Sequence, residues 1–210
     1  MKTRLLIARH GNTFKQGEIP RRVGANTDIP LVESEKSRLI GTYLKQSFTP
    51  DVSFSGPLKR TYQTAAQALA TVGLSSKHLT ILDMFREIDY GPDENKPESS
   101  VIARIGEAAI TAWNSHAIAP PGWKVDPKAI EESWLGFARM LENKHLGKNA
   151  FVVTSNGIAR FSPILCGSSE GHHLMDLKVN TGALCLFEKS PDEQHWHLRY
   201  WNKRPTELLT

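Results

Sequence analysis

The sequence has few cysteines, no long apolar stretch and no block of like charges. Its two cysteines, Cys166 and Cys185, are too few for a disulfide framework. We interpret them as buried apolar residues of a protein in a reducing compartment. The N-terminal apolar run has four residues, 5–8, which is too short for a signal peptide or a membrane span. We therefore expect a cytoplasmic protein that has no membrane partner.

The charge balance gives little support for a nucleic-acid partner. Lysine and arginine number 26 against 22 aspartates and glutamates, so the net charge is only +4. A basic tail would show a run of five or more like charges, and the chain has no such run. Its five tryptophans do not alternate with basic residues, as a stacking platform for bases would require. The positions of individual arginines therefore matter more than their number.

The length and composition are those of one ordinary globular domain. Of the 210 residues, 40% are hydrophobic and 23% are charged, which excludes disorder as the main state. A chain of this length buries roughly 70% of its unfolded surface, enough for one sizeable core. We expect a single domain over residues 1–210, with a cap-like insertion around residues 90–135.

Apolar runs and helical periodicities alternate along the chain, which predicts an α/β fold with a largely parallel sheet. The expected strands cover residues 4–8, 51–54, 80–84, 151–154, 183–187 and 195–201. The expected helices cover residues 34–47, 57–72, 101–116 and 127–145, with another from residue 158. Polar clusters follow three of the strands, at residues 9–11, 55–60 and 155–157. Because ligands bind at the carboxyl ends of parallel strands, we expect one shared site.

The first cluster has the residue types needed for phosphoryl transfer. A histidine such as His10 can attack phosphorus when one ring nitrogen is neutral and a hydrogen bond holds the other. Arg9 supplies a planar cation that binds phosphate oxygens in pairs. Gly11 lets the backbone approach a phosphate, and Asn12 and Thr13 add polar side chains. The alternative is an ordinary hydrogen-bonded histidine at the end of a strand.

Three segments resemble the histidine phosphatase superfamily, which has the phosphoglycerate mutase-like fold. Residues 5–13 read as an apolar strand followed by Arg-His-Gly-Asn-Thr. Residues 22–31 are similar to the family's loop with Arg and Asp-x-Pro-Leu. Residues 55–65, Ser-Gly-Pro-Leu-Lys-Arg-Thr-Tyr-Gln-Thr-Ala, are similar to the start of one of its helices. The resemblance implies a three-layer α/β/α sandwich with a mostly parallel central sheet.

The resemblance also implies roles for individual residues. His10 would accept the phosphoryl group, and Arg9 and Arg60 would hold the phosphate. Without the resemblance, Arg60 would be interpreted as a surface cation. Glu87 matches the family's acid and base, since one carboxyl group must protonate the leaving oxygen and then activate water. Asp89 is the competing carboxylate, and a surface pair of Glu87 with its neighbour Arg86 is the structural alternative. The remaining substrate-binding candidates are Gly11, Asn12, Thr13, Arg22 and Gly157.

The chain departs from the family pattern at Asn156. Family members carry a second histidine before the glycine that corresponds to Gly157. Asparagine can donate a hydrogen bond to a phosphoryl oxygen, but it cannot carry a charge or shuttle a proton. Losing such a contact lowers the rate by roughly 10²–10³-fold if nothing compensates, and His172 and His173 are candidates for compensation. Alternatively, Asn156 caps the helix that follows it.

Three functions remain open from the sequence. The first is a phosphomonoester hydrolase that acts on a small phosphorylated substrate through a phosphohistidine and needs no metal or other cofactor. The second is a phosphotransferase of the phosphoglycerate mutase type, although family mutases tend to be longer. The third is a weakened enzyme that mainly binds a phosphorylated ligand. Three tryptophans near the expected cap, Trp113, Trp123 and Trp134, belong either to the pocket or to the core, and the sequence defines no oligomeric state.

Overall fold

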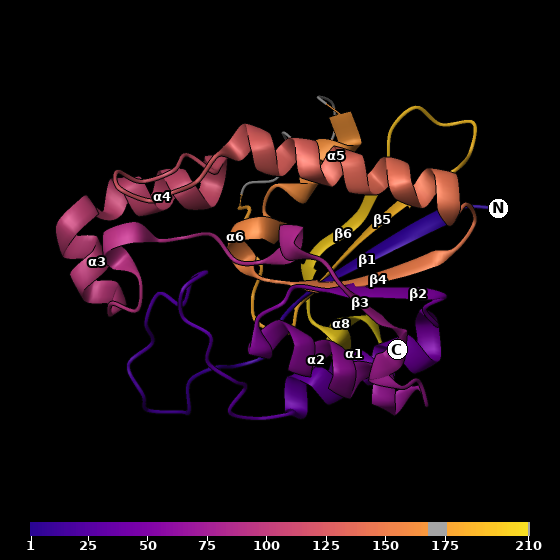
Figure 1. Ribbon diagram of the computed structural model, residues 1–210, viewed down its shortest axis with the longest axis horizontal. Coiled ribbons are helices and arrows are strands. Elements are labelled where there is room, and N and C mark those ends of the chain that lie inside the picture. The colour runs from indigo at the N-terminus through magenta and orange to yellow at the C-terminus, as the bar shows by residue number, and fades with distance from the viewer. Residues whose placement is uncertain (168–175, 210) are drawn as a thin grey trace.

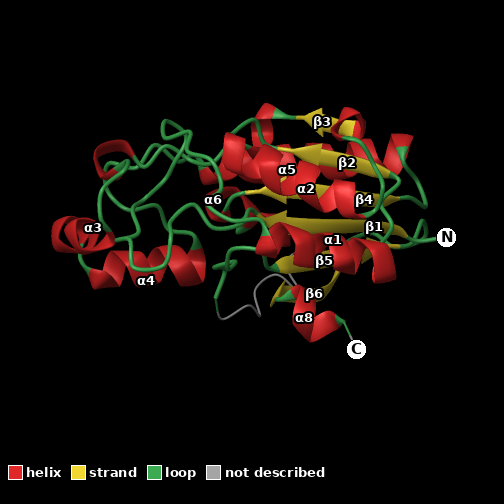
Figure 2. Ribbon diagram, turned by 90° about the horizontal axis from the view of Figure 1, so that it is seen from below, coloured by secondary structure: helices red, strands yellow, loops and turns green. Residues whose placement is uncertain are grey.

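A six-stranded mixed sheet forms the centre of the computed structural model, which describes residues 1–167 and 176–209 (Figure 2). The strand order is β3-β2-β4-β1-β5-β6. The first four strands in that order are parallel, and β5 and β6 are antiparallel to their neighbours. The strands are β1 (Thr3–Arg9), β2 (Val52–Ser55), β3 (Leu79–Ile81), β4 (Asn149–Thr154), β5 (Leu184–Lys189) and β6 (His197–Lys203).

Helices cover both faces of this sheet (Figure 1). One face is covered by α1 (Glu35–Ser47), α2 (Lys59–Thr71) and α8 (Pro205–Leu208), and the other by α5 (Pro127–Lys144). Alternate side chains of β1 point to opposite faces of the sheet. Leu6 and Ala8 belong to the core under α1 and α2, whereas Leu5 and Ile7 belong to the core under α5. The predicted three-layer α/β/α fold is confirmed.

Two further helices lie beyond the carboxyl ends of β1 and β4 (Figures 1 and 2). The expected single helix over residues 101–116 is wrong: α3 (Glu98–Ile105) and α4 (Glu107–His116) are separated by Gly106, whose φ of 82° an α-helix cannot contain. From Trp134 onwards, α5 packs on the sheet.

Short elements connect these layers. They are the 3₁₀ turns η1 (Ser76–His78), η2 (Asp83–Phe85), η3 (Gly91–Asp93) and η4 (Ser162–Cys166), and the single-turn helix α6 (Asn156–Ala159). The strand expected at 80–84 is shorter than predicted, since β3 ends at Ile81, and the helix expected from residue 158 begins two residues earlier, at Asn156. Within the described part of the chain, no helix has both the length and the apolar character needed to cross a membrane.

Candidate active site

The sheet register brings the three polar clusters to one edge. Arg9 pairs with Thr154 across β1 and β4, and Ser55 pairs with Val153 across β2 and β4. His10 follows directly after β1, and its backbone N–H donates to the carbonyl of Thr154. The residues at 9–11, 55–60 and 155–157 therefore surround the same end of the sheet.

The imidazole of His10 is held in one orientation. Its Nδ1 lies 2.7 Å from the carbonyl oxygen of Gly11, so Nδ1 carries the proton and donates it. The other nitrogen, Nε2, then has a free lone pair. The Gly11 N–H in turn donates to the hydroxyl of Thr64 at 3.0 Å, and that hydroxyl donates to the Arg60 carbonyl. Thr64, to which the sequence assigned no role, thus ties the His10 turn to α2.

The surroundings of His10 favour its neutral form. Burial lowers the pKa of His10 well below its ordinary value of 6.5, and the charges of Arg60 and Arg9 lower it further. A neutral imidazole keeps the lone pair that a nucleophile needs.

A titration of His10 should show this directly. At pH 6.5, where an ordinary histidine is half protonated, we expect nitrogen NMR to show His10 Nε2 unprotonated and Nδ1 protonated. The signal is assigned by its loss in His10→Gln. A titration midpoint at or above 6.5 would contradict this picture.

Arg60 and Arg9 are the cations whose charges lower the pKa of His10 most. Arg9 Nη1 donates to the carbonyl of Val179 at 2.6 Å. Arg60 is fully buried, and its two Nη atoms donate to the carbonyls of Val23, Gly24 and Thr27 at 2.8–3.1 Å. Arg60 therefore shapes the loop at 23–27 and is not a surface cation. Among the described residues, the buried Nε of each arginine has no hydrogen-bond partner.

Glu87 is buried beside these arginines. Its Oε2 accepts from the Gly157 N–H at 3.2 Å and from the hydroxyl of Tyr90 at 3.4 Å, and its Oε1 accepts from the Ile88 N–H at 2.9 Å. Its charge acts on both arginines, raising the pKa of Arg9 and of Arg60 against the lowering that burial causes. The carboxylate thus lies near the cations that surround His10.

The other residues near Glu87 in sequence point elsewhere. Asp89 accepts from the Gly91 N–H at 2.7 Å and pairs with Lys124 at 3.2 Å. Arg86 pairs with Asp83, so the alternative of a surface pair between Arg86 and Glu87 is wrong. Of the two carboxylates considered, Glu87 is the one at the site.

Gly157 makes room for the Glu87 carboxylate. A Cβ at position 157 would overlap Oε1 of Glu87 and approach Cγ1 of Ile88 at 2.8 Å. If Glu87 is the acid and base that the sequence predicts, we expect Gly157→Ala to lower kcat/KM by about 10²-fold, because a displacement of about 1 Å at such a group has an effect of this size.

The matched control is Gly136→Ala on α5, where a Cβ would meet only the flexible end of Arg139, at 3.8 Å. Steady-state rates of the two variants with an aryl phosphate make the comparison. Equal rates for both variants would show that the space beside Glu87 is unimportant.

Asn156 does not cap the helix that follows it. The N-cap residue of α6 is Ser155, and Asn156 is the first helical residue. Its Oδ1 accepts from the Val179 N–H at 2.8 Å, while the Val179 carbonyl accepts from Arg9. With its oxygen engaged, the side-chain NH₂ is the group of Asn156 that can donate to a ligand. His172 and His173, considered as compensating groups, lie outside the described residues.

The remaining candidates are Asn12, Thr13 and Arg22. Asn12 follows His10 and Gly11, and its Oδ1 accepts from Thr181 at 2.8 Å. Thr13 is half-buried at the start of the following loop. Arg22 pairs with Glu98 at 2.5 Å, and its positive charge lowers the pKa of Arg9.

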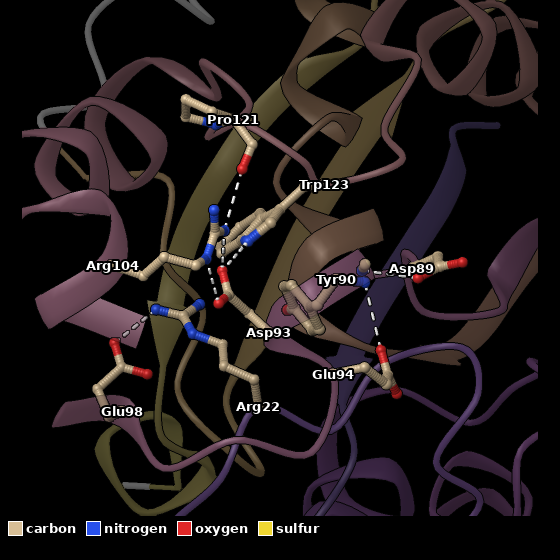
Figure 3. A network of polar contacts seen from close by, with 10 residues as sticks. Arg22, Asp89, Tyr90, Asp93, Glu94, Glu98, Arg104, Pro121 and Trp123 are labelled. Atoms are coloured by element: carbon tan, nitrogen blue, oxygen red, sulfur yellow. Dashed lines mark hydrogen bonds and ion pairs between the residues drawn. The ribbon is translucent and has the colours of Figure 1, made fainter. Parts of the chain in front are cut away.

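Aromatic and charged contacts connect Arg22 with the segment at 90–123 and hold that segment together (Figure 3). The Arg22 guanidinium lies over the rings of Trp123 and Tyr90, 5.0 and 5.5 Å from their centres. Buried Asp93 pairs with Arg104 and accepts from Nε1 of Trp123 at 2.7 Å. The three tryptophans considered for the pocket all belong to the buried core; they are Trp113, Trp123 and Trp134.

The chain is similar to known proteins over almost its whole length. The family model of the histidine phosphatase superfamily (branch 1) matches residues 5–204. A 2,3-bisphosphoglycerate-dependent phosphoglycerate mutase of Methylobacterium radiotolerans is 25% identical over 198 residues, covering 91% of this chain and 92% of that protein.

Two solved structures have a similar fold. A mycobacterial glucosyl-3-phosphoglycerate phosphatase has a TM-score of 0.75 at 18% identity, covering 97% of this chain and 100% of that one. A phosphoglycerate mutase of Bacillus anthracis has a TM-score of 0.76 at 19% identity, covering 96% and 93%. Together with the match over residues 5–204, the site at the end of β1 leads to one conclusion: the chain belongs to the histidine phosphatase superfamily.

Proposed function

We propose that the protein hydrolyses small phosphomonoesters through a phosphohistidine formed on His10. The observation that carries the proposal is the state of this imidazole. Nδ1–H donates to the Gly11 carbonyl, and burial with two neighbouring arginines keeps the ring neutral, so Nε2 is available to attack. This is the arrangement that a histidine nucleophile needs.

The first chemical step transfers the phosphoryl group to the enzyme. Nε2 of His10 forms a bond to phosphorus while the bond from phosphorus to the ester oxygen breaks. Glu87, protonated at this stage, gives its proton to the departing oxygen. Arg9 and Arg60 stabilise the charge on the phosphoryl oxygens, and the NH₂ group of Asn156 donates to one of them.

The second step returns the enzyme to its starting state. The Glu87 carboxylate removes a proton from water, and the resulting hydroxide attacks the phosphohistidine. The bond from Nε2 of His10 to phosphorus breaks, and inorganic phosphate leaves. Glu87 now holds the proton required for the next turnover, so one carboxyl group serves both steps.

Turnover of a simple aryl phosphate tests this proposal. Purified protein should release p-nitrophenol and phosphate from p-nitrophenyl phosphate without added metal. A protein that phosphate stabilises against heat, but that releases no product in long incubations, would instead be the weakened binding protein.

The second candidate function is a phosphoglycerate mutase. Similarity to a curated mutase over 91% of this chain favours it. A mutase would interconvert 2- and 3-phosphoglycerate when primed with a bisphosphate. It would transfer the phosphoryl group to these acids faster than to water. We expect hydrolysis to be the faster reaction, and the reverse result would replace the hydrolase proposal.

A further inference from the structure

Arg160 is a buried cation that the catalytic steps above do not use. Only 1% of its surface is exposed, and it follows α6 directly. Burial lowers its pKa to about 10, so it remains charged at neutral pH. Taking a guanidinium out of water is costly, and its polar contacts therefore indicate what it does.

Those contacts join two segments that are far apart in the sequence. Nη1 of Arg160 donates to the carbonyl of Trp113 at 2.5 Å, and Nε donates to the carbonyl of Asn156 at 3.3 Å. The guanidinium also lies over the Trp113 ring, 3.9 Å from its centre. Trp113 is in the last turn of α4, where the helix dipole favours a cation, and its carbonyl also accepts from the Ala117 N–H at 3.1 Å. Arg160 thus fastens α6 to the end of α4.

A helix as short as α6 needs such an anchor. It has four residues, far fewer than a helix needs to be stable by itself. Its second residue, Gly157, provides the N–H that holds Oε2 of Glu87. Movement of α6 would therefore move a hydrogen-bond donor of the catalytic carboxyl group.

We propose that Arg160 is a positioning residue that ties α6 to the last turn of α4 and so holds the Gly157 N–H against Glu87. The proposal rests on the proposed function, in which Glu87 protonates the leaving oxygen. A guanidinium suits this position because its rigid fork donates to two carbonyls in different directions. A lysine would keep the charge but has a single nitrogen, and a methionine would keep only the apolar packing.

The dependence of the rate on the leaving group tests this role. Phenyl phosphate and p-nitrophenyl phosphate are similar in size, but phenolate is the more basic leaving group and depends more on the proton from Glu87. We expect Arg160→Met to raise the ratio of kcat/KM for p-nitrophenyl phosphate to that for phenyl phosphate by about 10-fold, with Arg160→Lys between Arg160→Met and wild type. Glu87→Gln should change the ratio in the same direction.

The ratio of the two kcat/KM values distinguishes a positioning role of Arg160 from a simple loss of folded protein. Both substrates are measured on one preparation, so the fraction of folded enzyme cancels, and the exposed Arg139→Met on α5 serves as the matched control. A wild-type ratio in Arg160→Met, together with a changed ratio in Glu87→Gln, would overturn the role of Arg160. Turnover that persists in His10→Gln would instead overturn the proposed function.

Discussion

Replacing His10 by glutamine is expected to lower kcat for p-nitrophenyl phosphate by about 10⁴-fold or more, because the covalent route is lost entirely. Glutamine is close to histidine in size and can still contact the Gly11 carbonyl, so the fold should be retained. Steady-state rates of protein purified from a phosphatase-deficient host make the measurement.

The control for this variant is His78→Gln. His78 is exposed at the end of η1, and its Nδ1 lies 3.1 Å from the carbonyl of Ser75. This variant should have the wild-type rate. Equal turnover by His10→Gln and wild type would remove His10 from the mechanism.

Replacing Glu87 by glutamine is expected to lower kcat/KM for phenyl phosphate by about 10²–10³-fold, since an amide of the same shape cannot transfer the proton. The thermal unfolding midpoint, measured beside the rate, shows whether the buried amide is accommodated. A loss of activity at an unchanged midpoint would assign the loss to chemistry.

Asp89→Asn is the matched control for Glu87→Gln. Asp89 is the carboxylate two residues away, and it is engaged by the Gly91 N–H and by Lys124. Its substitution should change kcat/KM by less than about threefold, as for surface groups outside the site. A larger loss of kcat/KM in Asp89→Asn than in Glu87→Gln would assign the acid and base role to Asp89 instead of Glu87.

The sequence predicted which end of the sheet the three polar clusters share, because local patterns define it. Apolar runs that stop abruptly at Arg9-His10, at Ser55 and at Ser155 mark strands whose polar ends must share one edge of a parallel sheet. The helix break at Gly106 was missed because a single glycine is tolerated inside a helical pattern.

Other parts of the site could not be predicted because they depend on long-range contacts. Arg160 finds its acceptor at Trp113, 47 residues earlier in the chain, and no local pattern distinguishes it from an arginine on the surface. The contacts of Asp93 with Arg104 and Trp123 span 11 and 30 residues. The capping role considered for Asn156 failed because its side chain is engaged by Val179, 23 residues away. Tertiary hydrogen bonds outweigh local preference at these positions.

Trapping the covalent intermediate tests the central claim most directly. Protein mixed with a phosphorus-labelled aryl phosphate is quenched in alkali within a fraction of a turnover, digested and analysed by mass spectrometry. We predict label on His10 that is stable in alkali and lost in acid, and that is absent from His10→Gln. Turnover with no labelled protein, or with label on another residue, would contradict a mechanism through phosphohistidine at position 10.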